Sequence, residues 1–437
     1  MNIFEAAQKG DINEVKKQIA SGEDVNAKGE HCSTVLMYAL ESGNIELCKW
    51  LVEEKGADVN AAYECAEYLD YDEDIYGDRF EYSYYDFKET ALSYAINNGK
   101  TDIVHFLINH NVDINATGND GETALMLAAE KENTDVVKLL IEKGADINIK
   151  DYKGETALLY AVKNKNLDIL KLLIENGADV NAETNETALM RAAKNGNIIS
   201  AKYLVAHGAN INAFDSKCSS ALMYAVKSGN IELCRWLIEE NKANVNDIEH
   251  FEYTEIDTFS GNEKYYDYTE YALICAAKLN YWDITKLLIE HNAKIDLRDD
   301  DGETVLMYAV RAKKWDIVSF LIERGANIKA KNKNSKTVLM YAAESGNLEL
   351  CKELVNIKGL NIFLRDKKGQ TVLTYAVKSE NNDLCQWLVK EKMADINAEW
   401  EDISVIEAFK NGNIKACHNL IDSSFSENIS KYDDVPF

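Results

Sequence analysis

A short pattern, Thr-x-Leu-x-x-Ala, recurs along almost the whole chain, and most successive copies lie 31 to 34 residues apart. Twelve copies align, with the Thr-equivalent positions Asn2, Thr34, Thr90, Thr123, Thr156, Thr187, Ser220, Tyr271, Thr304, Thr337, Thr371 and Ser404. A unit of this size cannot bury its own apolar surface, so neighbouring units must stack to form a core. The pattern therefore predicts an array of one kind of unit, numbered here as repeats one to twelve.

Repeat four is the clearest copy and reads DGETALMLAAEKENTDVVKLLIEKGADINIKD. A Gly-x-Thr turn leads into a short helix, a polar break and a second helix whose apolar residues recur at helical spacing. Small residues at Ala128 and Ala129 suit a close approach between helices. The period and these motifs resemble the ankyrin repeat.

The resemblance covers essentially the whole chain and implies an all-α fold, an ankyrin-repeat solenoid of stacked helix-turn-helix units with hairpin-like connecting loops. We expect a single solenoid over residues 1–437. The atypical first and last copies predict an N-terminal cap repeat at about 1–28 and a C-terminal cap repeat at about 400–425, with a tail at 426–437.

The copies depart from the family pattern in ways that matter for packing. The family proline after the Thr is absent, and the family His two residues later is mostly Met, which puts the hydrogen bonds of that His in doubt. The next position is usually Leu in the family, but seven copies carry Tyr: Tyr38, Tyr94, Tyr160, Tyr224, Tyr308, Tyr341 and Tyr375. We interpret this column as an internal ladder between repeats. A stripe that contacts a ligand is the alternative.

Part of the chain is duplicated. Residues 32–60 and 218–246 are identical at 20 of 29 positions, and each stretch is followed by a long insertion, at 61–89 and at 247–270. Five repeats with their insertion therefore form a duplicated block. Both insertions lie between the Asn exit of one repeat and the Thr turn of the next, where projecting hairpin fingers lie in the family.

The two insertions are acidic and rich in tyrosine. The first holds ten acidic, two basic and seven Tyr residues, and the second holds eight acidic, one basic and four Tyr residues. Acidic loops without order are poor in aromatic residues, whereas Tyr is enriched at binding hot spots. We interpret the insertions as fingers that grip a basic partner; the alternative is that their tyrosines pack back on the repeats as braces. The residues expected to contact a partner are Tyr68, Tyr71, Asp72, Glu73, Asp74, Tyr76, Tyr84, Tyr85, Tyr253, Tyr265, Tyr266 and Tyr268.

In the family, further contacts come from the tips of the ordinary loops and from the start of the break between helices. Carried onto repeats four, five and nine, this resemblance implies contacts at Asn119, Asp120, Glu122, Glu130, Lys131, Tyr152, Lys153, Glu155, Lys163, Asn164, Asp300, Asp301, Glu303 and Arg311.

The sequence lacks the motifs of the common enzyme classes. It has no G-x-S-x-G, P-loop, dinucleotide-binding or HExxH pattern, so we expect no catalysis and no cofactor. Four cysteines (Cys48, Cys234, Cys351 and Cys385) share one inward position of the second helix, and no CxxC pair suits zinc. We therefore expect no metal and free thiols, and a reducing, cytoplasmic location.

The charge balance bears on the kind of partner. The chain carries 74 Asp and Glu against 48 Lys and Arg, a formal net charge of −26, which disfavours direct nucleic-acid binding and favours a basic protein. We expect a monomeric scaffold that binds a protein through its concave face and fingers, without membrane insertion. The alternative is an acidic inhibitor that blocks the site of a basic nucleic-acid-binding protein, nuclease or toxin.

Overall fold

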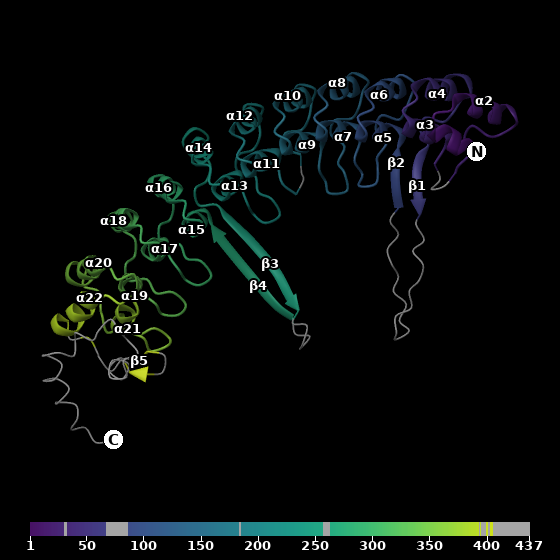
Figure 1. Ribbon diagram of the computed structural model, residues 1–437. Helices are drawn as coiled ribbons and strands as arrows, with labels where there is room; N and C mark the ends of the chain where they lie inside the picture. Colours follow the sequence, from purple (N-terminus) through teal and green to yellow (C-terminus); the bar gives the residue numbers. More distant parts are fainter. Residues whose placement is uncertain are drawn as a thin grey trace, which may run out of the picture. The chain divides into compact units, whose positions relative to one another are not determined.

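The computed structural model describes residues 1–29, 33–66, 86–182, 185–256, 263–392, 394, 399–400 and 403–404. Contacts divide the chain into two compact units, Met1–Ser216 and Lys217–Phe437. Each unit is a series of short helix pairs joined by loops, so the expected all-α repeat fold is confirmed (Figure 1). The single solenoid and the count of twelve repeats stay predictions, because the C-terminal cap repeat lies almost wholly outside the described residues.

The helices of the first unit alternate between two rows. The first helices of its repeats are α1 (Ile3–Gln8), α3 (Val35–Ser42), α5 (Ala91–Asn97), α7 (Ala124–Glu130), α9 (Ala157–Lys163) and α11 (Ala188–Lys194). The second helices are α2 (Ile12–Ala20), α4 (Ile45–Lys49) with the π-helical turn η2 (Trp50–Glu54), α6 (Thr101–Ile108), α8 (Thr134–Glu142), α10 (Leu167–Glu175) and α12 (Ile198–Ala206).

The second unit repeats the arrangement. Its first helices are α13 (Ala221–Lys227), α15 (Ala272–Lys278), α17 (Val305–Arg311), α19 (Val338–Glu344) and α21 (Val372–Lys378). Its second helices are α14 (Ile231–Arg235) with η3 (Trp236–Glu240), α16 (Trp282–Glu290), α18 (Trp315–Glu323), α20 (Leu348–Lys352) with η4 (Glu353–Ile357), and α22 (Asn382–Gln386) with η5 (Trp387–Glu391).

Four of the six described strands belong to the insertions that precede the first helices α5 and α15. β1 (Ala62–Ala66) pairs antiparallel with β2 (Asp86–Thr90), β3 (Ile248–Ile256) with β4 (Glu263–Tyr271), and β5 (Glu399–Trp400) with β6 (Ile403–Ser404). In four other repeats the same place holds a single bridge, such as Thr117 opposite Thr123. The two insertions therefore lengthen a hairpin that the repeat already has, and Figure 1 shows both hairpins on the side of their unit that carries the loops.

Polar residues in the break set where the second helices begin. The N-cap is Asn in seven of the second helices that the structure describes: Asn44, Asn133, Asn166, Asn197, Asn230, Asn347 and Asn381. The Asn133 Oδ1 atom accepts the Val136 N–H at 3.2 Å, which satisfies a backbone donor that the helix leaves unpaired. The Asn residue of the break therefore determines where the second helix begins.

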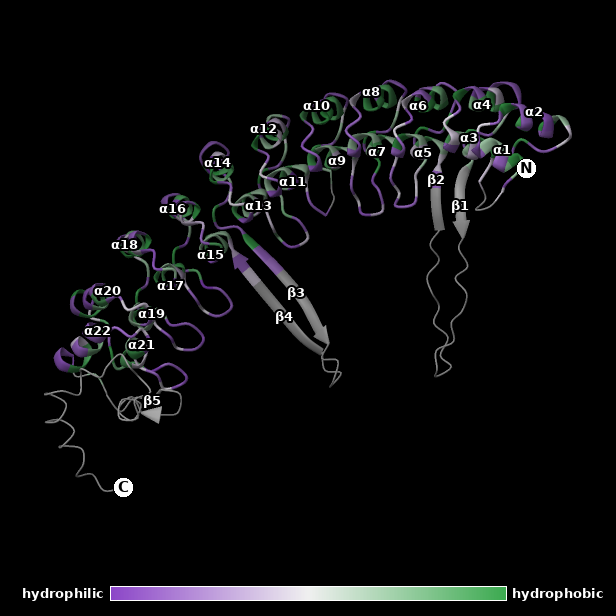
Figure 2. Cartoon of the chain, in the orientation of Figure 1, coloured by the Kyte–Doolittle hydropathy of each residue, from purple (hydrophilic) through white to green (hydrophobic). Residues whose placement is uncertain are grey.

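The core lies between the two helix rows and between neighbouring pairs. Ala128 and Ala129 are fully buried, as are Val137 and Leu140 on the facing side of α8. Figure 2 shows hydrophobic residues concentrated on the helices and hydrophilic residues on the connecting loops. Burying a Leu side chain contributes about 1.5–3 kcal/mol, so each repeat gains its stability from the repeats that it contacts.

Four second helices end in a π-helical turn because they are one residue longer than the others. In α8 the closing backbone bond runs from Ala145 N to Leu140 O, whereas after η3 it runs from Ala243 N to Leu237 O. The longer bond recurs after η2, η4 and η5. The extra residue is absorbed in the last turn and the flanking residues keep their places. Sequence reasoning missed this insertion.

The predicted inward cysteine position is confirmed. Cys48, Cys234, Cys351 and Cys385 are all fully buried, as is Val137 at the same position of α8. Burial raises the pKa of the Cys234 thiol to about 12. The Cys234 thiol therefore stays protonated and packs as a small apolar group.

We predict that Cys234→Asp lowers the free energy of unfolding by at least about 3 kcal/mol, because it buries a carboxylate without a partner. Cys234→Val conserves volume and should cost less than about 1.5 kcal/mol. Urea unfolding followed by circular dichroism measures both. An Asp variant as stable as the parent would place this position at the surface.

Deleting Glu240, an exposed residue of η3, should convert the π turn to an ordinary helical turn. We expect the free energy of unfolding to change by less than about 1 kcal/mol, because Leu237 and Ala243 then take the spacing of Leu140 and Ala145. The matched control deletes Lys143, the C-cap residue of α8, a helix that has no extra residue, and should cost at least about 2 kcal/mol. Equal costs in urea unfolding would show that the extra residue is not absorbed in η3.

Candidate functional site

A buried acidic residue closes the tip of an ordinary loop. In repeat five, the Asp151 Oδ1 atom accepts the backbone N–H groups of Lys153 at 2.9 Å and of Glu155 at 2.7 Å. Its Oδ2 atom accepts the hydroxyl of Tyr160 at 2.9 Å. The loop is thus tied to the first helix by one side chain, which makes the tip a preorganised surface.

The tyrosine column supplies the helix side of this tie. Tyr308 donates to Asp299 Oδ2 at 2.5 Å, and Tyr375 donates to Asp366 Oδ2 at 2.6 Å. Burial and the neighbouring carboxylate raise the pKa of both phenols. Tyr308, Tyr341 and Tyr375 are buried, as the internal-ladder interpretation expects. The other four tyrosines of the column are half-buried: Tyr38, Tyr94, Tyr160 and Tyr224. The sequence signal that we missed is an Asp nine residues before the Tyr.

Charged side chains along the row of first helices are paired with one another. Arg191 Nη2 lies 2.5 Å from Glu155 Oε1 of the preceding repeat, and Lys163 Nζ lies 3.4 Å from Glu130 Oε1. Partly exposed pairs of this kind contribute little to stability. Their consequence is electrostatic, because these carboxylates already have cations beside them.

In the second unit the same row holds cations against aromatic rings. Lys336 Nζ lies 2.6 Å from Glu344 Oε2 and 3.9 Å from the ring centroid of Tyr341. The guanidinium carbon of Arg311 lies 4.6 Å from the ring centroid of Tyr308. Aromatic rings of the repeats thus contact the cationic side chains of Lys336 and Arg311, and Lys336 also pairs with a carboxylate.

The ordinary loops present only part of the predicted contact set. Asp120, Lys131, Tyr152, Lys153, Lys163, Asp301 and Arg311 are exposed, whereas Asn119, Glu122, Glu130, Glu155, Asn164 and Asp300 are half-buried. Tyr152 is the most prominent, with 79% of its surface exposed. Its backbone N–H donates to Asp120 O of the neighbouring tip at 2.9 Å, so adjacent tips form a connected surface.

The prediction that Glu303 contacts a partner is wrong. Only 5% of its surface is exposed. Its carboxylate accepts the Tyr341 hydroxyl and, at 2.8 Å, the Asn332 Nδ2 group. Glu303 therefore links repeats nine and ten from inside and is not offered to a partner. The sequence resemblance could not show this, because the same position is half-buried at Glu122 and Glu155.

The predicted finger residues divide between described and undescribed segments. Tyr68, Tyr71, Asp72, Glu73, Asp74, Tyr76, Tyr84 and Tyr85 lie outside the described residues, whereas Tyr253 lies in β3 and Tyr265, Tyr266 and Tyr268 lie in β4. The question whether the fingers bind a partner or brace the repeats therefore rests on the bases of the hairpins.

The base of the β3–β4 hairpin is held by buried charge. Glu249 is 2% exposed, accepts the Ser219 hydroxyl at 2.7 Å and pairs with Lys227 Nζ. Glu270, its cross-strand partner, lies 3.2 Å from Lys278 Nζ. The two lysines end α13 and α15. The hairpin is thereby attached to the first helices of repeats seven and eight.

Two further contacts hold the same base. The buried Asp247 carboxylate accepts the Ser220 hydroxyl, and burial raises the pKa of Asp247. The His250 backbone N–H donates to Lys217 O at 2.7 Å. This second bond matches the one between Tyr152 and its neighbouring tip, so the hairpin replaces an ordinary tip without disturbing the connected surface.

The base of the β1–β2 hairpin is built differently. By the register of the duplication, Glu41 and Tyr63 stand where Lys227 and Glu249 stand in the second block. The Glu41 carboxylate accepts the Gln8 Nε2 group at 2.9 Å. The lysine–glutamate contact is therefore particular to the second hairpin.

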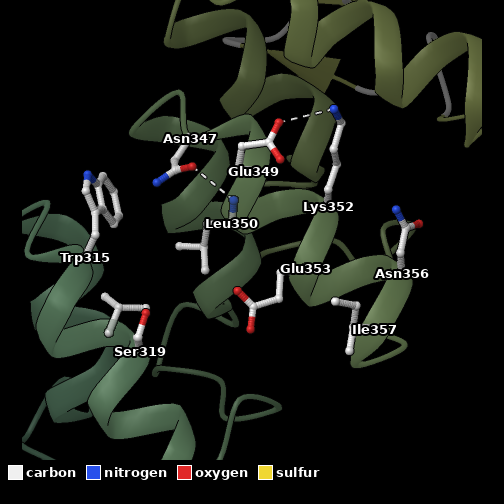
Figure 3. Close-up of a pocket in the computed structure, with 10 residues that line it drawn as sticks. Trp315, Ser319, Asn347, Glu349, Leu350, Lys352, Glu353, Asn356 and Ile357 are labelled. Carbon is white, nitrogen blue, oxygen red and sulfur yellow. Dashed lines mark hydrogen bonds and ion pairs between the residues drawn. The ribbon is translucent and has the colours of Figure 1, made fainter.

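A pocket of about 450 Å³ lies among second helices, between α18 and α20 with η4. Figure 3 shows Trp315 and Ser319 on one side and Leu350 and Glu353 on the other. Glu353 is the first residue of η4, whereas Trp50, Trp236 and Trp387 are the first residues of the other π turns. The pocket therefore lies where this repeat has a glutamate in place of a tryptophan. Its lining includes no His or Cys, so Ser319 lacks the imidazole base that usually activates such a nucleophile.

Within the described part of the chain, no group of three or more His, Cys, Asp or Glu side chains could hold a metal ion. None of the helices described there is long and apolar enough to cross a membrane.

We predict that Lys227→Met lowers the free energy of unfolding by about 3 kcal/mol, because Glu249 then keeps a buried charge without its cation. Adding Glu249→Gln removes that charge and should restore at least half of the loss. Urea unfolding of both variants measures the difference. A double variant no more stable than Lys227→Met would mean that the pair does not hold the hairpin base.

Comparison with known proteins agrees with the repeat geometry. The family model for ankyrin repeats in three copies matches residues 3–117, 61–151, 92–184, 158–249, 255–332 and 324–400. A search of curated proteins returned no match. Ankyrin repeats are generally protein–protein interaction modules, and the family is typically non-catalytic. Because these matches together cover most of the chain, from residue 3 to residue 400, the chain belongs to the ankyrin repeat family.

Proposed function

We propose that this chain is a non-catalytic scaffold that binds a basic protein partner through its two hairpins and the adjoining row of first helices. The observation that carries the proposal is where the surplus negative charge lies. The insertions at 61–89 and 247–270 hold −15 of the formal −26. Carboxylates on the helix row, such as Glu155 and Glu344, have their own cations.

The composition of the insertions supports binding rather than bracing. Eleven of the 23 tyrosines of the chain lie in these two segments. Tyr offers large contact area at low entropic cost and is enriched at interface hot spots. Carboxylates around such anchors speed encounter with a basic partner and set its orientation. The two features together suit recognition of a protein.

The base of the second hairpin supports the same proposal. Its attachment uses Glu249, Glu270 and the backbone of His250, all next to the repeats. A hairpin held at its base is preorganised, which lowers the entropy cost of binding.

An inhibitor that covers the nucleic-acid site of a basic protein is the second candidate. The concentration of −15 in two segments favours it. The two functions differ in what a bound partner can still do. An inhibited partner loses its nucleic acid, whereas a partner held by a scaffold keeps it.

To test the proposal, 64–88 and 250–269 are each replaced by Asn-Asp-Gly, the tip of repeat four at Asn119–Gly121. This graft keeps Glu249 and Glu270. We expect helical content to be unchanged and the free energy of unfolding to change by less than about 1 kcal/mol, because surface loop length affects stability weakly. Affinity for the partner captured by the parent chain should fall at least about tenfold.

Surface plasmon resonance at low and high ionic strength supplies the measurement. Association that slows steeply with salt indicates steering by the hairpin carboxylates. Adding nucleic acid to the complex separates inhibitor from scaffold. Grafted variants that fold and still bind the partner as the parent does would exclude the hairpins as the binding elements.

A further inference from the structure

The register of the β3–β4 ladder gathers aromatic residues on one face. Phe251 lies opposite Tyr268, and Tyr253 lies opposite Tyr266. Residues two apart on a strand share a face, so these two rows are neighbours on the same face. We name these four residues the aromatic face of the hairpin.

Charged rows flank the aromatic face, one of two acids and one of an acid and a lysine. Towards the base, the next row on this face is Glu249 opposite Glu270, and towards the far end it is Glu255 opposite Lys264. Lys227 contacts Glu249 from the end of α13. The aromatic face is therefore on the same side of the ladder as Glu249 and Glu270, which contact the lysines at the ends of α13 and α15.

The opposite face has a different composition. Its three middle rows are His250 with Thr269, Glu252 with Asp267, and Thr254 with Tyr265, and its end rows are Ile248 with Tyr271 and Ile256 with Glu263. Two acids directly opposed across a ladder repel each other. The hairpin thus combines one aromatic face and one polar, acidic face, a division that local charge counts do not reveal.

The repeats of this chain already show what such a combination binds. Arg311 stacks on Tyr308, whose hydroxyl is bonded to the Asp299 carboxylate. Lys336 lies over Tyr341 and beside Glu344. In both places a cation sits on an aromatic ring with a carboxylate within the same small network. The aromatic face likewise places aromatic residues next to acidic residues of the ladder.

We propose that the aromatic face binds arginine side chains of an arginine-rich segment of the protein partner, an inference that rests on the proposed function. The eight acidic residues against one basic residue of 247–270 supply the charge complementarity. A guanidinium is planar, weakly hydrated and able to stack on a ring while it donates to a carboxylate. A lysine ammonium carries the same charge but stacks less well.

The test compares two peptides of equal charge, nonaarginine and nonalysine, for binding to the full chain by fluorescence anisotropy. We expect nonaarginine to bind at least about fivefold more tightly. Both peptides gain the same Coulomb attraction, and the guanidinium groups also stack on the aromatic rings. Equal affinities would overturn the inference, because charge alone would then account for binding.

A neighbouring pair of tyrosines supplies a matched control. Tyr266 belongs to the aromatic face, and Tyr265, the adjacent residue, belongs to the other face. Tyr253→Ser with Tyr266→Ser should reduce the preference for nonaarginine to less than about twofold, whereas Tyr265→Ser should leave it unchanged. Thermal unfolding confirms that all variants fold. A loss in Tyr265→Ser as large as in the double variant would also overturn the inference.

The experiments distinguish failure of the arginine inference from failure of the proposed function. If grafted hairpins abolish partner binding but the peptides bind equally, the hairpins bind a basic partner without selecting arginine. If grafted hairpins leave partner binding intact, the proposed function itself fails. The arginine inference is supported only when the peptide preference and its loss in the aromatic-face variant occur together.

Discussion

Burial of apolar surface between neighbouring helix pairs is the interaction on which the rest of this molecule depends. Ala128 and Ala129 allow close approach, and Val137 and Leu140 fill the space behind them. Because no pair can bury this surface alone, each repeat is stable only through its neighbours. The same dependence explains the π turns, which absorb an extra residue while the core positions before them stay in register.

Once the helix pairs are stacked, the loops are tied to them by polar contacts. Asp151 and Tyr160 show the basic unit, in which one carboxylate closes the tip and accepts a hydroxyl from the first helix. At the β3–β4 hairpin, buried charge at Glu249 takes over the role of holding the loop. A stiff apolar array thus carries polar tips in defined positions, as protein recognition requires.

Charged residues are distributed differently between the repeats and the insertions of this chain. Along the first helices, acids and bases neutralise one another, and aromatic rings such as Tyr308 and Tyr341 hold cations in place. The insertions carry the surplus acid together with tyrosine. Identical chemistry therefore serves internal cohesion in the repeats and, in our proposal, binding of arginine on the hairpin.

The sequence by itself determined the repeat, the helix pairs, the inward cysteines and the two hairpin sites, because period, apolar spacing and cap residues are local signals. The contact between Asp299 and Tyr308 has a local signal, the spacing of nine residues, which we missed. The sequence could not show that Glu303 is buried or that Glu249 meets Lys227, since these depend on contacts between residues that are distant along the chain. Nor could it show which residues pair across the β3–β4 ladder, such as Tyr253 with Tyr266. Only the tertiary structure decided these points, because strand pairing and stacking, rather than local propensity, bring the groups together.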